Sequence, residues 1–216
     1  MKVELIRNSG SDLDVVNAAR VSFDKESKEF TEKDAKLIKY LADHNHFTPF
    51  THCTATLRIK APLFVARQLF KHQVGLSVNE VSRRYVDTTP EFYWPDKWRK
   101  RAENKKQGSS DEEVDLTSVF SKRNFSLETE IHVANCEAVN TYNALLQAGV
   151  CPEQARMILP QNMYTEFFWT GSLYAFARVC NLRLQPDAQY ETRLIAEQIN
   201  EIMSKLYPVS WSNLVK

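Results

Sequence analysis

The sequence predicts one domain of mixed strands and helices, with helices dominant, spanning the whole chain of 216 residues. Apolar and polar residues alternate over residues 2–7 and 54–59, which is typical of half-buried strands. Apolar residues recur at helical spacing over residues 33–44, 126–149 and 187–207. The chain contains no internal repeat, so a solenoid is not indicated.

Polar residues mark the start of each early helix. After the strand at residues 2–7, Asp12 or Asp14 is expected to cap a helix over residues 15–20. Thr31 begins a capping box ahead of the helix at residues 33–44.

Prolines and a glycine divide the next part of the chain. Pro49 ends the preceding helical region, and the strand at residues 54–59 follows it. Pro62 suits the first turn of a helix over residues 62–73, which Gly75 is expected to end. The hydrogen-bonding stretch that comes next is interpreted as a polar loop.

The second half of the chain opens with a change of composition. Residues 96–118 carry a basic run and then an acidic run, and they are interpreted as an insertion with a flexible tip. A long helix is expected from Ser126 to Gly149, and a short one from Pro152. The remaining elements are an aromatic strand or helix lead-in at residues 164–172 and helices over residues 173–184 and 187–207.

Glycine usage excludes two common nucleotide-binding motifs. The chain has five glycines, and they are too widely spaced to form G-x-G-x-x-G or a P-loop. Side chains or helix ends must therefore hold any bound phosphate.

The net charge and the cysteine content limit the binding partners and the cellular locations that we expect for the protein. The net charge of +1 gives no general attraction to nucleic acid or to an acidic membrane. The four cysteines form no C-x-x-C pair, and no apolar run approaches the ~18 residues of a membrane span. We expect a reduced, cytoplasmic protein without a membrane segment.

Basic residues concentrate between Arg58 and Arg84. This segment contains six of them and only one acidic residue, Glu80. Gln68, Lys71 and His72 follow helical spacing within this segment, so they can share one helix face. The segment suits an anion that carries a heteroaromatic ring. Charge runs are more often solvated surfaces with ion pairs, and that alternative stays open.

A second set of arginines, Arg156, Arg178 and Arg183, lies in largely apolar surroundings. Such arginines pair with phosphates or carboxylates, and an ordinary salt bridge to Glu153 or Glu191 is the commoner case. His44, His46, His52 and Cys53 match no standard zinc spacing, so we expect no metal site.

One stretch resembles the signature of the flavin-dependent thymidylate synthases. That signature is Arg-His-Arg, seven residues and Ser, inside a longer R-Q-x-x-R-H-R…N-E-x-S-x-R-Y pattern, and residues 67–85 read RQLFKHQVGLSVNEVSRRY. Lys71 and Gln73 replace the two arginines, and one extra residue separates His72 from Ser82.

Four further blocks resemble the same family in the same order. They are AARVSF at residues 18–23, HFTPFTH at 46–52, EQARMILPQNMYTEFFWT at 153–170 and NLRLQPDAQYE at 181–191. Thr51 stands where the family usually has Glu. No single block would be specific, but five ordered blocks are.

The resemblance implies a fold and an activity. The fold would be α/β (α+β), a central, mostly antiparallel sheet flanked by long helices. The activity would be conversion of dUMP to dTMP, with methylenetetrahydrofolate as carbon donor and FAD, reduced by NADPH, as hydride source. The assembly would be a homotetramer whose active sites are shared between subunits.

The resemblance also implies site residues. The dUMP site would use Gln68, Lys71, Glu80, Ser82, Arg83, Arg84, Arg156 and Arg183. The FAD site would use Thr48, Lys71, His72, Gln73, Glu80, Ser172, Tyr174 and Arg178. Arg183 would be the catalytic group, because a guanidinium beside the uracil N3/O2 edge favours the ionised ring and pushes electron density to C5.

Two alternatives remain open. Four altered positions motivate a relative that hydroxymethylates C5 of dUMP or dCMP, namely Thr51, Lys71, Gln73 and Tyr174. A non-catalytic nucleotide or single-stranded nucleic-acid binder would instead combine the basic segment with the aromatic side chains Phe92, Trp94 and Trp98.

Overall fold

A four-stranded antiparallel sheet forms the centre of the molecule. The computed structural model describes residues 1–86, 88–103 and 108–216. The strand order is β1-β2-β6-β3, in which every neighbouring pair is antiparallel. The strands are β1 (Lys2–Ser9), β2 (Thr54–Pro62), β3 (Leu76–Glu80) and β6 (Tyr164–Ser172).

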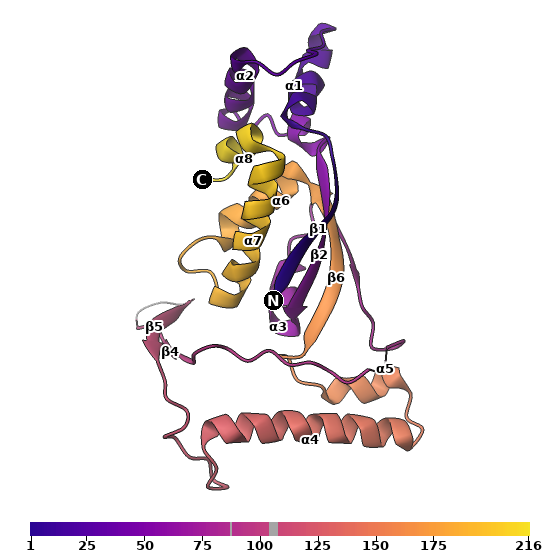
Figure 1. The fold of residues 1–216 in the computed structure, drawn as a ribbon, viewed down its shortest axis with the longest axis vertical. Helices are drawn as coiled ribbons and strands as arrows, with labels where there is room; N and C mark the ends of the chain where they lie inside the picture. Colours follow the sequence, from indigo (N-terminus) through magenta and orange to yellow (C-terminus); the bar gives the residue numbers. More distant parts are fainter. Residues whose placement is uncertain (87, 104–107) are drawn as a thin grey trace.

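One face of this sheet is covered by helices. Leu57, Ile59 and Trp169 point into the main core and are almost fully buried, whereas Arg58 and Phe168, one position along, are exposed. Figure 1 shows three of the covering helices on one side of the strands. The helices over the sheet are α3 (Leu63–Leu69), α6 (Leu173–Arg183), α7 (Tyr190–Leu206) and α8 (Pro208–Leu214), and the same core extends to the two helices described next.

The two ends of the molecule carry the remaining elements. At one end lie α1 (Asp12–Arg20), α2 (Glu32–Asp43) and the 3-10 turns η1 (Val21–Phe23) and η2 (Thr48–Thr51). At the other, α4 (Leu127–Gln147) runs outside the sheet beside α5 (Pro152–Ala155) and η3 (Arg156–Ile158), as Figure 1 shows. A small separate cluster around Tyr142 joins α4 to the body.

Several expected elements are confirmed. Thr31 forms a complete capping box with Asp34 at the start of α2. Gly149, just beyond α4, has φ +85°, as expected for a residue that ends a helix in the left-handed region. Residues 164–172, which the sequence left undecided, form strand β6 because β2 and β3 supply backbone partners on both sides.

The helix expected over residues 62–73 is too long. α3 ends at Leu69, and the amide of His72 bonds to the Leu69 carbonyl in a tighter turn, so Gln68, Lys71 and His72 do not share a helix face. The chain must reverse here to place β3 against β6. Gly75, at φ +75°, makes that reversal possible at low cost.

Three smaller expectations also need correction. Ser11, not Asp12 or Asp14, is the N-cap residue of α1. Residues 76–80 form strand β3 in place of the expected loop, since the edge of β6 satisfies their backbone groups. Helix α8 was not foreseen; the Asp12 carboxylate accepts hydrogen bonds from its Val209 and Ser210 amides, both at 2.9 Å.

The insertion at residues 96–118 contains a short two-stranded ladder. Its strands are β4 (Arg99–Arg101) and β5 (Ser109–Glu113). The tip at residues 104–107, which the sequence predicted to be flexible, lies outside the described residues. Among the described residues, no helix is long and apolar enough to cross a membrane.

Candidate functional site

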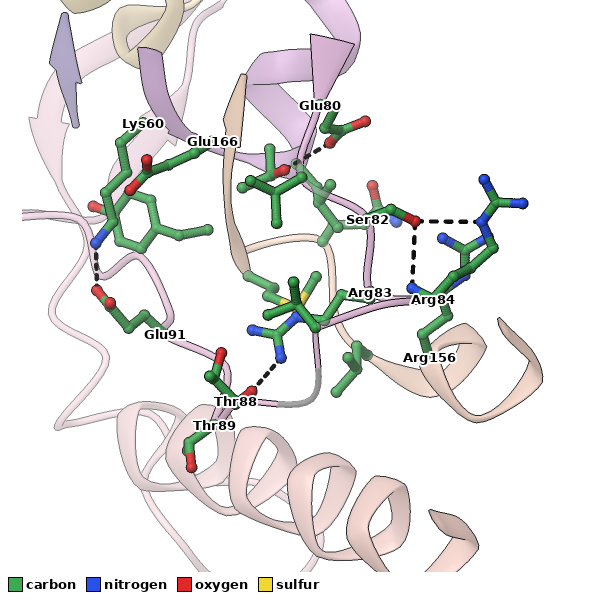
Figure 2. Close-up of a pocket in the computed structure, with 18 of the residues that line it drawn as sticks. Lys60, Glu80, Ser82, Arg83, Arg84, Thr88, Thr89, Glu91, Arg156 and Glu166 are labelled. Carbon is green, nitrogen blue, oxygen red and sulfur yellow. Dashed lines mark hydrogen bonds and ion pairs between the residues drawn. The ribbon is translucent and has the colours of Figure 1, made fainter. Parts of the chain in front are cut away.

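A wide cleft opens beside the end of β3, on the sheet face that the helices leave uncovered. Its volume is about 860 Å³. The loop after β3, the start of β6, η3 and residues 88–91 line it (Figure 2). Five predicted dUMP residues gather there, namely Glu80, Ser82, Arg83, Arg84 and Arg156. We call these five the cleft group.

The arginines of the cleft group have few internal partners. The Ser82 hydroxyl accepts from the amide and Nε of Arg84, both at 3.3 Å, and Arg156 Nε donates to the Glu153 carbonyl at 3.3 Å. Arg83 donates to the Thr88 carbonyl. Across residues 1–86, 88–103 and 108–216, none of the three forms an ion pair with a carboxylate. Figure 2 shows Arg84 and Arg156 on the same side of the cleft, where their charges are available to an anion.

Other basic residues of the Arg58–Arg84 segment are engaged with acids. Arg58 pairs with Glu166 at 2.5 Å, and Lys60 pairs with Glu91 at 2.7 Å. For these two residues the ordinary interpretation, surface ion pairs, is correct. Both ion pairs lie in the wall of the cleft, where Arg83 and Arg84 of the same segment have no carboxylate partner among the described residues.

Three other predicted residues form a separate, half-buried group. Arg183 Nε donates to His72 Nε2 at 3.0 Å, and Arg183 Nη2 donates to the Gln68 carbonyl at 3.4 Å. The Gln68 side chain also bonds to Gln189 and Thr192 of the α7 region. We call Gln68, His72 and Arg183 the inner cluster; within one protomer none of them lines the cleft.

The electrostatics of the inner cluster favour a neutral His72. Burial, and then the positive charges of Arg183 and Arg178, hold the pKa of His72 below its usual 6.5. Burial also lowers the pKa of Arg183, although an arginine remains charged at neutral pH. Arg183 has no carboxylate partner in the described part of the chain, and Glu191, its suggested partner, pairs with Arg99 instead.

The predicted FAD residues are dispersed. Ser172 is the N-cap of α6, and its hydroxyl accepts from the Ala175 amide at 3.2 Å. Tyr174 stacks on Phe47 at 5.3 Å between ring centroids, next to Thr48 in η2. Tyr174 and Arg178 line a small cavity of about 200 Å³. Lys71 and Gln73 are exposed in the turn before β3, and Glu80 belongs to the cleft group.

Two of the three aromatic residues of the nucleic-acid alternative pack against other side chains, whereas Trp98 is 37% exposed. Trp94 stacks on His132 with 3.9 Å between ring centroids, and Phe92 packs in the small cluster around Tyr142. The described residues also contain no group of three or more His, Cys, Asp or Glu side chains able to hold a metal ion.

The comparisons with known proteins decide the family. The profile described as "Thymidylate synthase complementing protein" matches residues 4–209. The flavin-dependent thymidylate synthase of Thermus thermophilus is 41% identical over 210 residues, which cover 97% of this chain and 74% of that protein. The chain belongs to the flavin-dependent thymidylate synthases. The enzyme of Thermotoga neapolitana is 39% identical over 99% of this chain and 90% of its own length.

Solved structures agree with this membership. A UMP/dUMP methylase, PolB from Streptomyces cacaoi, solved with 5-Br dUMP, superposes with a TM-score of 0.78 at 31% identity, covering 98% of this chain and 93% of that one. Its structure with 5-Br UMP gives a TM-score of 0.81 at 30% identity, covering 98% and 92%. Membership confirms the expected fold and enzyme class, with FAD, the folate donor and NADPH as the family's cofactors.

Sequence reasoning missed the residues that support the inner cluster. Gln189 and Thr192 bond to the Gln68 side chain. Glu191 accepts from Gln189 and pairs with Arg99. Gln189 and Glu191 lie in the A-Q-x-E block that the family resemblance had already singled out. No local pattern connected that block to Gln68, which is more than a hundred residues away in the chain.

Proposed function

We propose that this protein converts dUMP to dTMP by reductive methylation and that Ser82 and the arginines of the cleft group hold the nucleotide phosphate. Arg84 and Arg156 supply charges without an ion-pair partner among the described residues, and the Ser82 hydroxyl lies beside them. Arginine forks suit phosphate oxygens, so no glycine-rich loop is needed. The likeness to PolB, solved with bromo-substituted dUMP, supports this placement.

The division of the predicted dUMP residues supports a shared active site. The cleft group and the inner cluster do not line a common cavity in one protomer, yet each carries part of the expected nucleotide site. The cleft also has exposed apolar residues at its margin, with Met157 80% and Val81 49% exposed. We propose a homotetramer in which the inner cluster of one subunit completes the cleft of another.

Mixing two variants at a dUMP concentration too low to saturate Arg84→Ala tests the shared site, because each variant alone is then nearly inactive. Arg84→Ala damages only the cleft group and Arg183→Ala only the inner cluster. If sites are shared, mixed tetramers regain activity, because some sites receive both intact parts. Light scattering gives the oligomeric state, and an assembly that stays monomeric would contradict the proposal.

Arg183 is the group that we propose to act on the uracil ring. Its guanidinium is half-buried and has no carboxylate partner in the described residues, so it can stabilise negative charge that develops on the ring. His72 accepts a hydrogen bond from Nε and thereby fixes the plane of the guanidinium. Arg183 keeps its proton, so its role is electrostatic and it is not a base.

The residues near Tyr174 suit part of a bound flavin. The stacked rings of Phe47 and Tyr174 offer an apolar face, and Arg178 offers a cation beside them. When bound, the flavin supplies the hydride that it receives from NADPH. Thr48, Lys71, His72 and Gln73 would orient it, and Ser172 would do so while capping α6.

The proposed activity is tested by the absorbance spectrum of the protein and by the mass of the nucleotide product. Purified protein should show a flavin absorbance that NADPH bleaches and that folate donor and dUMP restore. Mass spectrometry of the nucleotide should then show the gain of one methyl group. A hydroxymethyl product would support the related C5-hydroxymethylating enzyme, and a colourless protein that binds oligonucleotides would support the non-catalytic alternative. UMP, run in parallel, tests whether the sugar is selected.

A further inference from the structure

The insertion at residues 96–118 is joined to the body by a buried ion pair. Arg99 of β4 contacts Glu191, in the first turn of α7, at 2.5 Å, and the two side chains are only 13% and 6% exposed. The Arg99 guanidinium also lies 4.5 Å from the centre of the Tyr190 ring. A buried ion pair is weak evidence for stability, because desolvation offsets the attraction. The other contacts of Glu191 show what else the pair could do.

The second carboxylate oxygen of Glu191 starts a chain of hydrogen bonds. Glu191 Oε2 accepts from Gln189 Nε2 at 3.0 Å. Gln189 Oε1 in turn accepts from Gln68 Nε2. Finally, Gln68 Oε1 accepts from the Thr192 hydroxyl at 3.2 Å. The chain therefore runs from the insertion to a residue of the inner cluster.

The Glu191 carboxylate, at one end of this chain, determines which atom of each glutamine amide donates and which accepts. An ionised carboxylate only accepts hydrogen bonds, so the NH₂ of Gln189 must face Glu191 and its oxygen must face Gln68. The NH₂ of Gln68 must then face Gln189. Burial opposes ionisation of Glu191, but hydrogen bonds led by that from Arg99 outweigh it, and the pKa of Glu191 lies below its usual range.

We propose that Glu191, held by Arg99, is a positioning residue that fixes which way the Gln68 side-chain amide points in the nucleotide site. After its two internal bonds, the amide keeps one N–H and one oxygen lone pair free for a ligand. The inference rests on the proposed function, in which Gln68 binds dUMP. It gives the insertion a role that its own sequence does not indicate.

The substitution Glu191→Gln tests this without removing a hydrogen bond. A glutamine can accept from Arg99 and donate its NH₂ to a flipped Gln189. Gln189 would then donate to a flipped Gln68, and Gln68 would donate to the Thr192 hydroxyl. Every internal bond survives, but the polarity that Gln68 presents to the nucleotide is reversed.

The measurement is the dUMP dissociation constant of the flavin-loaded enzyme, by calorimetry. Glu191→Gln and Gln68→Ala should each weaken dUMP binding roughly ten-fold, the size of one hydrogen bond. The double variant should bind no more weakly than Gln68→Ala alone, because Glu191 acts only through Gln68. Glu197→Gln is the matched control: it makes the same change on α7, in an exposed pair with Arg193, and should bind dUMP as the wild type does.

Three results would overturn the inference. They are unchanged dUMP affinity in Glu191→Gln, unchanged affinity in Gln68→Ala, and additive losses in the double variant. If Glu191→Gln unfolds because Arg99 is left with an uncompensated charge, Arg99→Met combined with Glu191→Leu removes both charges and the acceptor that orients Gln189. This variant should again weaken dUMP binding, with no further loss when Gln68→Ala is added. A wild-type protein that binds dUMP and makes dTMP keeps the proposed function whatever these variants do, whereas one that binds no dUMP contradicts that function itself.

Discussion

The cleft group and the inner cluster both contain arginines, but these differ in exposure and in their hydrogen-bond partners. In the cleft group, Arg84 and Arg156 are exposed and bond mainly to a neighbouring hydroxyl or carbonyl. In the inner cluster, Arg183 is half-buried and bonds to His72 and to the Gln68 backbone. The inner cluster is thus ordered before any ligand arrives, while the cleft group presents free charge to solvent.

This difference indicates a division of labour. A preorganised guanidinium stabilises charge that develops during reaction, since it needs no rearrangement at that moment. Exposed arginines bind a phosphate whose charge does not change during the reaction, so they contribute mainly to affinity. Substituting Arg183 should therefore affect mainly turnover, and substituting Arg84 or Arg156 should affect mainly dUMP binding.

The largest effect is expected for Arg183→Ala. Turnover should fall by a factor on the order of 100 to 1,000, the cost of removing one group that stabilises developing charge. Much of the flavin should remain bound, which the absorbance of the purified variant measures. Flavin loss combined with normal chemistry on added FAD would contradict the role given to Arg183.

Arg84→Ala and Arg156→Ala should come next, as losses of dUMP affinity. Each removes charge-assisted hydrogen bonds worth about 1.5–3 kcal/mol, or roughly ten- to a hundred-fold in the dissociation constant. The thermal midpoint should stay unchanged, because neither side chain supports the fold. Arg123→Ala is the control: it pairs with Glu130 outside the cleft and should leave dUMP affinity as it is. A loss of turnover at saturating dUMP would contradict the prediction that the cleft arginines act mainly in binding.

The pH dependence of stability should show a smaller effect of the inner cluster, through His72. The pKa of His72 is lowered in the folded protein, so the unfolded chain takes up the proton first as the pH falls. Its contribution to stability is complete above pH 6.5 and is lost as the pH drops from there through the lowered pKa, by at most about 1.4 kcal/mol per pH unit. NMR titration of the ligand-free protein should show this pKa, and Arg178→Ala should raise it by removing a nearby positive charge. A His72 pKa above 6.5 would show that burial and the two arginines do not dominate.

Ser82→Ala should have the smallest effect. The hydroxyl lies beside Arg84, and its loss removes one neutral hydrogen bond of about 1 kcal/mol, or a few-fold in dUMP affinity. Some turnover should persist. If turnover disappears while dUMP binds normally, Ser82 has a chemical role beyond binding.

Local patterns predicted those elements whose stability depends on local interactions. The Thr31 capping box and the glycine after α4 are decided within a few residues, and both are confirmed. The helix over residues 62–73 was overestimated, because its end is set by the need to pair β3 with β6. Helix α8 was missed because its cap, Asp12, lies almost two hundred residues earlier in the chain.

The sequence by itself determined the family and the absence of a glycine-rich phosphate loop, and it predicted the residues that we propose for the site. These follow from residue identity and spacing, which a motif records directly. The tertiary structure decided which arginines are paired and which remain free, since Arg58 meets Glu166 only across two strands and Glu191 meets Arg99 only through the insertion. It also separated the expected nucleotide residues into the cleft group and the inner cluster, with Lys71 in neither, because β3 and α3 leave the reversing turn at residues 70–75 in different directions. Distance along the chain does not specify distance in space, and partnership between charges depends on distance in space.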